Sequence, residues 1–296
     1  MHVLNGLKQK GQKRMDLLNK IATGNLQAEA KPEDYEKDGL LHCGNCHTPK
    51  QYAYEIKLND KVVKGKGAVI CKCEQARLDE LEKQNRKLDF EYWKNKMILN
   101  GLGKSQYQHY TFGNDDLKNP EITDMCKAYV ENWEKVRANN LGLLFCGPVG
   151  TGKTFYAVAI ANALIDKKVS VKVTSIAELI GQMQTYNDEN KQRVIDEINH
   201  VELLVIDDVG TERETPFGLE QVMLVINNRA TSGKPAIATT NSTLEELRTP
   251  TNIAYKRIYD RVLEMCSTQI QVNGKSRREA IQEEKDVKAM KILGLI

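Results

Sequence analysis

The chain has 296 residues, of which 41% are hydrophobic and 28% are charged, and its net charge is +3 at pH 7. This is an ordinary globular composition, and so small a net charge does not by itself predict binding to nucleic acid. No stretch approaches the roughly 20 apolar residues that cross a bilayer, and lysines interrupt the N-terminus where a signal peptide would be apolar. We therefore predict a cytoplasmic protein with no membrane contact. The length favours two units over one.

The first hundred residues are polar and rich in lysine. Residues 1–40 have the loosely spaced apolar residues of a short helical arm. Residues 41–100 begin with a Gly- and Lys-rich segment in which strands at 52–58 and 62–70 would form a hairpin, with Asn59-Asp60 as its turn. These features predict a small N-terminal lobe followed by a charged helix.

The charged helix is predicted from residue 74 to residue 100. Leu78, Leu81, Leu88 and Tyr92 follow at alternating three- and four-residue steps if Asn85 is counted among them. This resembles a short coiled-coil seam, but it covers fewer than three or four heptads. We favour an amphipathic helix that packs on its own domain. Glycines then end the helix, and residues 101–120 are predicted to form a linker.

Helices and strands alternate from residue 121 to the end of the chain, as a parallel α/β sheet requires. The strands are short and apolar, whereas the helices carry apolar residues with a period near 3.6. We therefore predict an α/β domain over 121–296. Its expected strands are 141–145, 170–173, 203–206, 236–239 and 268–272, and its expected helices are 122–137, 153–167, one from about 177, 216–229 and 254–265.

A glycine-rich loop follows the first of these strands and precedes a helix. Successive backbone N–H groups in such a loop wrap around phosphate oxygens, and the helix directs its positive dipole end at the same anion. The lysine of the loop would reach the β- and γ-phosphates, and the following threonine would bind Mg²⁺. This spacing predicts an ATP-binding P-loop. Its residues are Gly147, Pro148, Val149, Gly150, Thr151, Gly152, Lys153 and Thr154.

Polar residues end two other predicted strands. Asp207 and Asp208 follow the apolar run 203–206, and Asn241 follows the strand at 236–239. Nucleotides bind at the carboxyl edge of open α/β sheets, where these side chains would lie. We expect Asp207 to hold Mg²⁺, Asp208 to orient the attacking water as a base, and Asn241 to lie beside the γ-phosphate.

Four of the seven cysteines form two close pairs. Cys43 and Cys46 are separated by two residues, and Cys71 and Cys73 are separated by one. Four thiolates are the usual ligand set of structural zinc, and a lobe this small cannot build an adequate apolar core. We therefore predict a zinc site, for which His42 and His47 are possible substitute ligands.

In order and spacing these motifs resemble those of the AAA+ ATPases, and within them the DnaC/DnaI helicase loaders and their IstB-like ATP-binding relatives. The resemblance covers roughly residues 105–280. Beyond the P-loop and the aspartate pair, it includes Gly210 with Glu212, the spaced arginines Arg257 and Arg261, and the run Gly274-Lys-Ser-Arg-Arg278.

The resemblance implies an AAA+ P-loop core, with a parallel sheet flanked by helices, and a small N-terminal zinc-binding domain. Arg261 then corresponds to the arginine finger that enters the ATP site of a neighbouring subunit, although two arginines on one helix otherwise indicate a solvated face. Arg278 corresponds to the second sensor, which contacts the γ-phosphate of its own subunit. Asp208 stands where many AAA+ proteins have glutamate, which predicts slow hydrolysis. Arg277 replaces the usual tyrosine, and the short segment that follows implies a reduced or absent lid.

The function that the resemblance implies is ATP-dependent loading of a hexameric replicative DNA helicase onto single-stranded DNA during replication initiation, in a bacterium or a phage. Hydrolysis would be slow and stimulated by assembly or by single-stranded DNA, and copies of the chain would associate through the ATP site. The zinc lobe would contact the helicase, or else DNA through its lysines and Tyr52 or Tyr54. The alternatives are an IstB-like transposition helper ATPase and a nucleotide-gated DNA-binding adaptor with little turnover.

Overall fold

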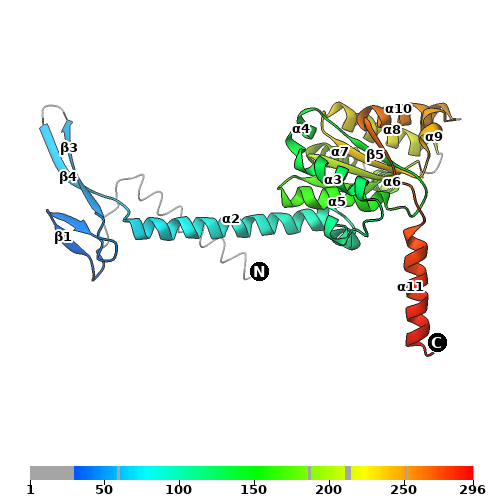
Figure 1. Ribbon diagram of the computed structural model, residues 1–296. Coiled ribbons are helices and arrows are strands. Elements are labelled where there is room, and N and C mark those ends of the chain that lie inside the picture. The colour runs from blue at the N-terminus through cyan, green and yellow to red at the C-terminus, as the bar shows by residue number, and fades with distance from the viewer. Residues whose placement is uncertain (1–29, 59–60, 186–187, 211–214, 251, 296) are drawn as a thin grey trace. The chain divides into compact units, whose positions relative to one another are not determined.

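The computed structural model describes residues 30–58, 61–185, 188–210, 215–250 and 252–295. The predicted arm over 1–29, the turn Asn59-Asp60 and Glu212 lie outside these residues. The chain forms two compact units, residues 1–89 and residues 90–296 (Figure 1).

The first unit contains two antiparallel hairpins and the beginning of a long helix. The strands of the second hairpin pair in register from Gln51 with Ala68 to Leu58 with Lys61, close to the predicted hairpin. A two-stranded sheet alone buries neither of its faces, and among the described residues of this unit no second layer packs on it. Its elements are β1 (Tyr35–Lys37), β2 (Leu40–His42), β3 (Gln51–Leu58), β4 (Lys61–Ala68) and the start of α2 (Lys72–Gly101).

Helix α2 is longer than predicted at its beginning, and its first half is exposed. Leu81 is 42% exposed and Leu88 is 54% exposed, so the prediction that this helix packs its apolar side on its own domain is wrong for that half. Charged and polar residues occur all around the helix there, so this half can remain solvated. Near its C-terminal end, Trp93, Met97 and Ile98 pack against the core of the second unit.

The second unit is built around a five-stranded parallel sheet with the strand order β6-β7-β8-β5-β9. The chain crosses from β5 to the far edge at β6 and returns inward through β7 and β8, so β5 lies between strands that are distant from it in sequence. Polar residues after β5, β7 and β8 therefore meet at one edge of the sheet. The strands are β5 (Leu143–Cys146), β6 (Val171–Ser175), β7 (Leu203–Val209), β8 (Ala236–Thr240) and β9 (Thr268–Gln271).

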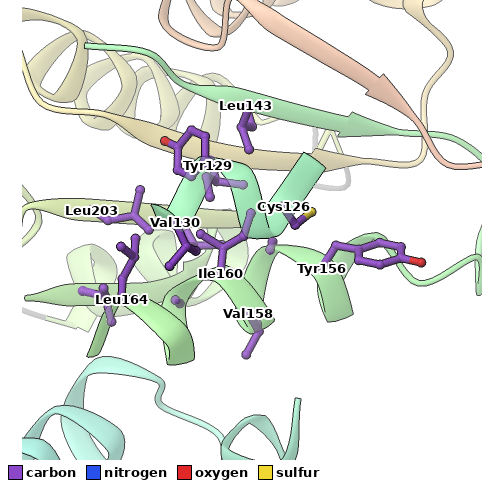
Figure 2. Close-up of a cluster of buried hydrophobic side chains, with 14 of the residues drawn as sticks. Cys126, Tyr129, Val130, Leu143, Tyr156, Val158, Ile160, Leu164 and Leu203 are labelled. Atoms are coloured by element: carbon purple, nitrogen blue, oxygen red, sulfur yellow. The ribbon is translucent and has the colours of Figure 1, made fainter. Parts of the chain in front are cut away.

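Helices cover both faces of this sheet, which confirms the predicted fold class. Alternate strand residues point to opposite faces, so Leu143 and Leu203 join one buried cluster while Leu144 and Leu204 join the other. On the first face, helices α3 and α5 pack Val130 and other apolar side chains on the sheet (Figure 2). The helices are α3 (Pro120–Glu131), α4 (Trp133–Ala138), α5 (Lys153–Asp166), α6 (Ile176–Thr185), α7 (Asp188–His200), α8 (Pro216–Thr231), α9 (Leu244–Arg248), α10 (Ile253–Met265) and α11 (Arg277–Ile292).

Residues 101–120, for which the sequence predicts a linker, are instead packed on the second unit. They contain two short 3-10 helices, η1 (Ser105–His109) and η2 (Phe112–Asn114). Leu102 and Tyr107 are buried in the first apolar cluster. The side-chain amide of Asn162, on α5, donates hydrogen bonds of 2.8 Å to the carbonyls of Tyr107 and Tyr110. These contacts hold the segment against the helix that follows the P-loop.

Candidate nucleotide site and candidate zinc site

The glycine-rich loop between β5 and α5 has the backbone conformation that its glycines permit. Gly147, Gly150 and Gly152 have φ values of 139°, 82° and 104°, a region that side chains with a Cβ disfavour. Lys153 folds back into the loop, where its Nζ donates to the carbonyls of Gly147 and Pro148 at 2.8 and 2.7 Å. Burial lowers the pKa of Lys153. The loop therefore holds one ammonium group inside its curvature at the start of α5.

Asp207 lies beside the loop and is held by two hydroxyl groups. Thr154 Oγ1 and Thr239 Oγ1 each donate to Asp207 Oδ1 at 2.7 Å, and the residue is 5% exposed. The structure thus brings together the threonine and the aspartate that the sequence assigns to Mg²⁺. A hydroxyl and a carboxylate oxygen are the hard ligands that Mg²⁺ takes, so this pair fits the ion.

Asp208 has an unusual backbone conformation, because strand β7 is irregular at this point. The pairing of β7 with β8 shifts register between Ile206 and Val209, and Asp208 has φ of 56°, in the left-handed region that non-glycine residues rarely occupy. Its N–H donates to Thr239 Oγ1 at 2.9 Å. The Asn241 amide donates to its carboxylate at 3.4 Å. Burial and the neighbouring Asp207 raise the pKa of Asp208.

A pocket of about 600 Å³ opens over these groups in the second unit. Arg278 reaches its lining from an exposed position at the start of α11. Arg261 does not line the pocket; it lies on α10, 45% exposed, and pairs with Glu264 at 2.6 Å. The sequence-predicted residues that line the pocket are Val149, Gly150, Gly152, Lys153, Thr154, Asp208, Asn241 and Arg278.

Arg277 also lines the pocket, and it lies closer to the P-loop than the sequence indicates. Its guanidinium hydrogen-bonds the Tyr156 hydroxyl at 3.2 Å and pairs with Asp116 at 3.0 Å. A Cβ built on Gly152 would lie 2.2 Å from Nη1 of Arg277. The sequence already showed that arginine stands at position 277, where the family usually has tyrosine. Nothing in the sequence indicated Asp116.

Tyr107 is a second residue that sequence reasoning missed. It is 4% exposed, and its hydroxyl donates to Asp207 Oδ2 at 3.3 Å while accepting from Lys104 Nζ at 3.2 Å. Burial and Asp207 raise the pKa of Tyr107 to about 12, so the hydroxyl keeps its proton. Both oxygens of Asp207 are thus hydrogen-bonded. The sequence offered no signal for this contact, because Tyr107 lies 100 residues before Asp207 in a predicted linker.

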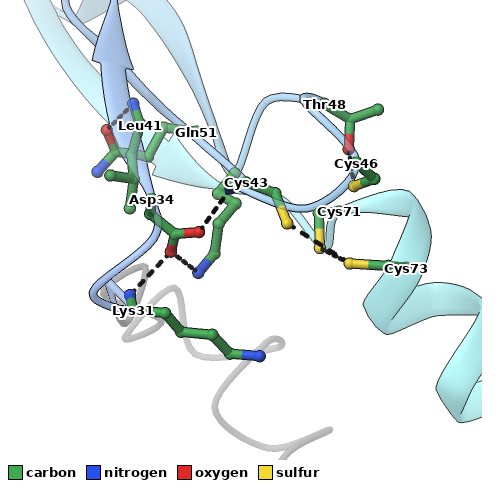
Figure 3. A network of polar contacts seen from close by, with 11 residues as sticks. Lys31, Asp34, Leu41, Cys43, Cys46, Thr48, Gln51, Cys71 and Cys73 are labelled. Atoms are coloured by element: carbon green, nitrogen blue, oxygen red, sulfur yellow. Dashed lines mark hydrogen bonds and ion pairs between the residues drawn. The ribbon is translucent and has the colours of Figure 1, made fainter.

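The four clustered cysteines of the first unit lie together in space. Their sulfur atoms are all within 4.8 Å of one another, and Cys73 Sγ is 3.5 Å from Cys43 Sγ and 3.3 Å from Cys71 Sγ (Figure 3). Tetrahedral zinc with Zn–S bonds of about 2.3 Å separates its sulfur ligands by about 3.8 Å. The cluster therefore fits zinc with cysteine ligands alone. His42 is turned to the carbonyl of Leu40, at 2.9 Å.

Asp34 supports the loop that carries the first two cysteines. Its carboxylate accepts hydrogen bonds from the N–H groups of Lys31 and Gly44 at 2.8 and 3.0 Å, and it pairs with Lys50 at 2.5 Å (Figure 3). These contacts, with the Lys31 N–H first among them, lower the pKa of Asp34 to about 2. A carboxylate here was not predicted, since aspartates are common in loops of this composition.

Comparison with known proteins agrees with this architecture. Residues 104–285 match the family described as IstB-like ATP binding protein. The replicative helicase loader DnaC of Escherichia coli (strain K12) is 27% identical over 188 residues, which are 62% of this chain and 73% of that protein. The replicative helicase loader DnaI of Bacillus subtilis (strain 168) is 25% identical over 186 residues, 57% of this chain and 58% of that protein. A crystal structure of DnaI has a TM-score of 0.50 at 21% identity, over 60% of this chain and 96% of that chain.

The P-loop, the strand-end aspartates and the parallel sheet define an ATP-binding protein of the AAA+ class. The chain belongs to the family of IstB-like ATP-binding proteins, and its similarity to DnaC and DnaI confirms the resemblance found in the sequence. Among the described residues, no helix is both long enough and apolar enough to span a membrane.

Proposed function

We propose that this protein is an ATP-dependent loader of a hexameric replicative DNA helicase onto single-stranded DNA. The observation that carries the proposal is the nucleotide pocket, which brings Lys153, Thr154, Asp208 and Asn241 together in a chain related to two helicase loaders. The family match covers this pocket. The four-cysteine cluster supplies a second unit through which such a loader would dock on its helicase.

In the proposed ATPase, the P-loop N–H groups and Lys153 would bind the phosphates. Thr154 and Asp207 would hold Mg²⁺, whose charge stabilises the phosphates when it is bound. Asp208, half-buried and hydrogen-bonded by Asn241, would orient the attacking water. The side chain of Asp208 is shorter than the glutamate of many AAA+ proteins, and it would hold the water less well, which suits slow turnover. We assign the protein the role of a switch that assembly or single-stranded DNA would stimulate.

The position of Arg261 supports self-association through the ATP site. It lies outside the pocket of its own subunit and is free to reach a neighbour at the cost of one exposed pair with Glu264, a pair that contributes little stability. Arg261→Ala should therefore lower ATP turnover at least about tenfold while ATP affinity is unchanged. Mixing Arg261→Ala with Asp208→Ala protein should restore part of the rate. Where the two variants meet, one site combines Asp208 of the first variant with Arg261 of the second. A mixture as inactive as its components would contradict a finger acting between subunits.

The loader role is tested with the full-length protein and the replicative helicase from the same source. Immobilised protein should capture the helicase, and the pair should place it on circular single-stranded DNA, which has no free end, in the presence of ATP. Cys43→Ser/Cys46→Ser protein should fail to capture while it still binds ATP. No capture with ATP, with ADP or without nucleotide would reject the loader role. Stimulation by a transposase–DNA complex would then favour the transposition helper.

A further inference from the structure

The hairpin β3–β4 has one face that is aromatic and apolar. Directly opposed residues of an antiparallel pair share a face, and here Tyr52 faces Gly67, Tyr54 faces Gly65 and Ile56 faces Val63. The side chains of this face are open to solvent: Tyr52 is 53% exposed, Tyr54 37%, Ile56 50% and Val63 45%. Two strands alone bury neither face, so contacts within the hairpin do not account for these residues.

The two glycines leave room for the ends of the tyrosine rings over the opposite strand. A Cβ built on Gly67 would lie 2.5 Å from Cζ of Tyr52, and one built on Gly65 would lie 2.5 Å from Cζ of Tyr54. The ring ends therefore lie directly over the opposite strand, in space that any other residue would fill. The ring centroids are 6.2 Å apart, with an interplanar angle of 51°. The two rings are therefore tilted relative to each other, and both keep surface open to solvent.

The rest of the hairpin is basic. Lys57, Lys64 and Lys66 are exposed; Lys64 pairs with Glu55 at 3.0 Å, and the described residues form no ion pair with Lys57 or Lys66. The ribbon is only two strands wide, so flexible lysine side chains from its other face bring their charge to its edges. Flat aromatic rings beside mobile cations are the combination that holds bases by stacking and a phosphate backbone by charge.

We propose that the Tyr52–Tyr54 face of this hairpin binds single-stranded DNA by stacking bases on the two rings. The proposal rests on the DNA contact in the proposed function and assigns part of that contact to the zinc-bearing unit. A protein partner is the less favoured occupant, because the flanking lysines attract a polyanion and the two ring faces are the surface that successive bases need.

The test is the affinity of full-length protein for a fluorescent dT oligonucleotide, measured by anisotropy, and for the same strand with abasic positions. Tyr52→Leu/Tyr54→Leu should lower dT affinity at least about tenfold. Binding of the abasic strand should already be weak and should not change further. Tyr52→Phe/Tyr54→Phe should bind as wild type, because stacking needs the ring and not the hydroxyl. Tyr92→Leu, which removes a 67% exposed tyrosine from α2, is the matched control and should change affinity less than twofold.

Each outcome decides one question, provided that zinc content shows the lobe intact in every variant. If the Tyr52→Leu/Tyr54→Leu variant bound the oligonucleotide as tightly as wild type, the hairpin assignment would be overturned. The proposed function would be unaffected. Retained DNA binding with lost helicase capture would identify the face as a protein-docking surface instead. Failure of wild-type protein to bind the oligonucleotide in any nucleotide state would overturn both this assignment and the DNA contact of the proposed function.

Discussion

The described residues of the two units differ in how far they are buried. In the ATP-binding unit, apolar side chains fill both faces of a five-stranded sheet, and two clusters of buried residues result. In the described part of residues 30–89, Cys43 and Cys71 alone are buried. Hydrophobic burial can thus account for the fold of the larger unit, whereas we expect the fold of the smaller one to depend on a metal bound by its cysteines. The difference implies that the two units respond to different perturbations.

The largest expected effect is that of zinc removal, which should unfold the smaller unit and leave the larger one intact. Removing zinc with a chelator, or making Cys43→Ser, should unfold residues 30–71, because structural zinc contributes on the order of 10 kcal/mol to such lobes. Limited proteolysis should then cleave this region, while ATP affinity and the melting temperature of the larger unit stay unchanged. Added Zn²⁺, but not Mg²⁺, should reverse the effect of the chelator. If removing zinc also lowered ATP affinity, the two units would not be independent.

A substitution in the P-loop should affect the larger unit and leave the smaller one unchanged. Lys153→Ala should lower ATP affinity by about 100-fold, since the loop loses the one ammonium group inside its curvature. Calorimetric titration measures the affinity, and zinc content should be unaffected. Lys127→Ala, on the exposed side of α3, is the control and should bind ATP as wild type. Unchanged affinity in Lys153→Ala would remove the phosphate assignment.

A smaller effect is expected at Tyr107, which holds the second oxygen of Asp207. Tyr107→Phe should raise the Mg²⁺ concentration needed for half-maximal ATP binding by about tenfold, because a hydrogen bond to a carboxylate contributes about 1.5 kcal/mol. Binding of ATP without Mg²⁺ should not change. Tyr92→Phe, on α2 and outside the pocket lining, should leave both unchanged. An equal loss with and without Mg²⁺ would indicate a packing role only.

The smallest effect concerns stability and pH. Because burial and Asp207 raise the pKa of Asp208 in the folded protein, its ionisation costs stability as pH rises above the unfolded value of about 3.9. Asp208→Asn removes this cost, so nucleotide-free variant should melt about 1–3 °C above wild type at pH 7.5. The difference should shrink as pH falls towards 4. The exposed Asp124→Asn should show no such difference, and a pH-independent gap would contradict the assignment.

Several of the residues that the sequence patterns singled out line one pocket beside the glycine-rich loop. The P-loop and the apolar strand before Asp207 could be recognised because their chemistry depends on neighbours in the chain: glycines at set spacings, and a buried strand that ends in a carboxylate. The fold class followed from the alternation of helices and strands. The clustering of the four cysteines was likewise indicated by two close pairs.

Contacts between distant segments were decided by the tertiary structure. The segment over 101–120 looks polar enough for a linker, yet Tyr107 reaches Asp207 because Asn162 and the apolar cluster hold it there. The register shift that places Asp208 in a left-handed conformation arises from the pairing of β7 with β8. Residue spacing determines local structure, such as a glycine-rich loop or a strand that ends in a carboxylate. Which side chains meet depends on strand order and helix packing, and these arise from burial summed over the whole unit.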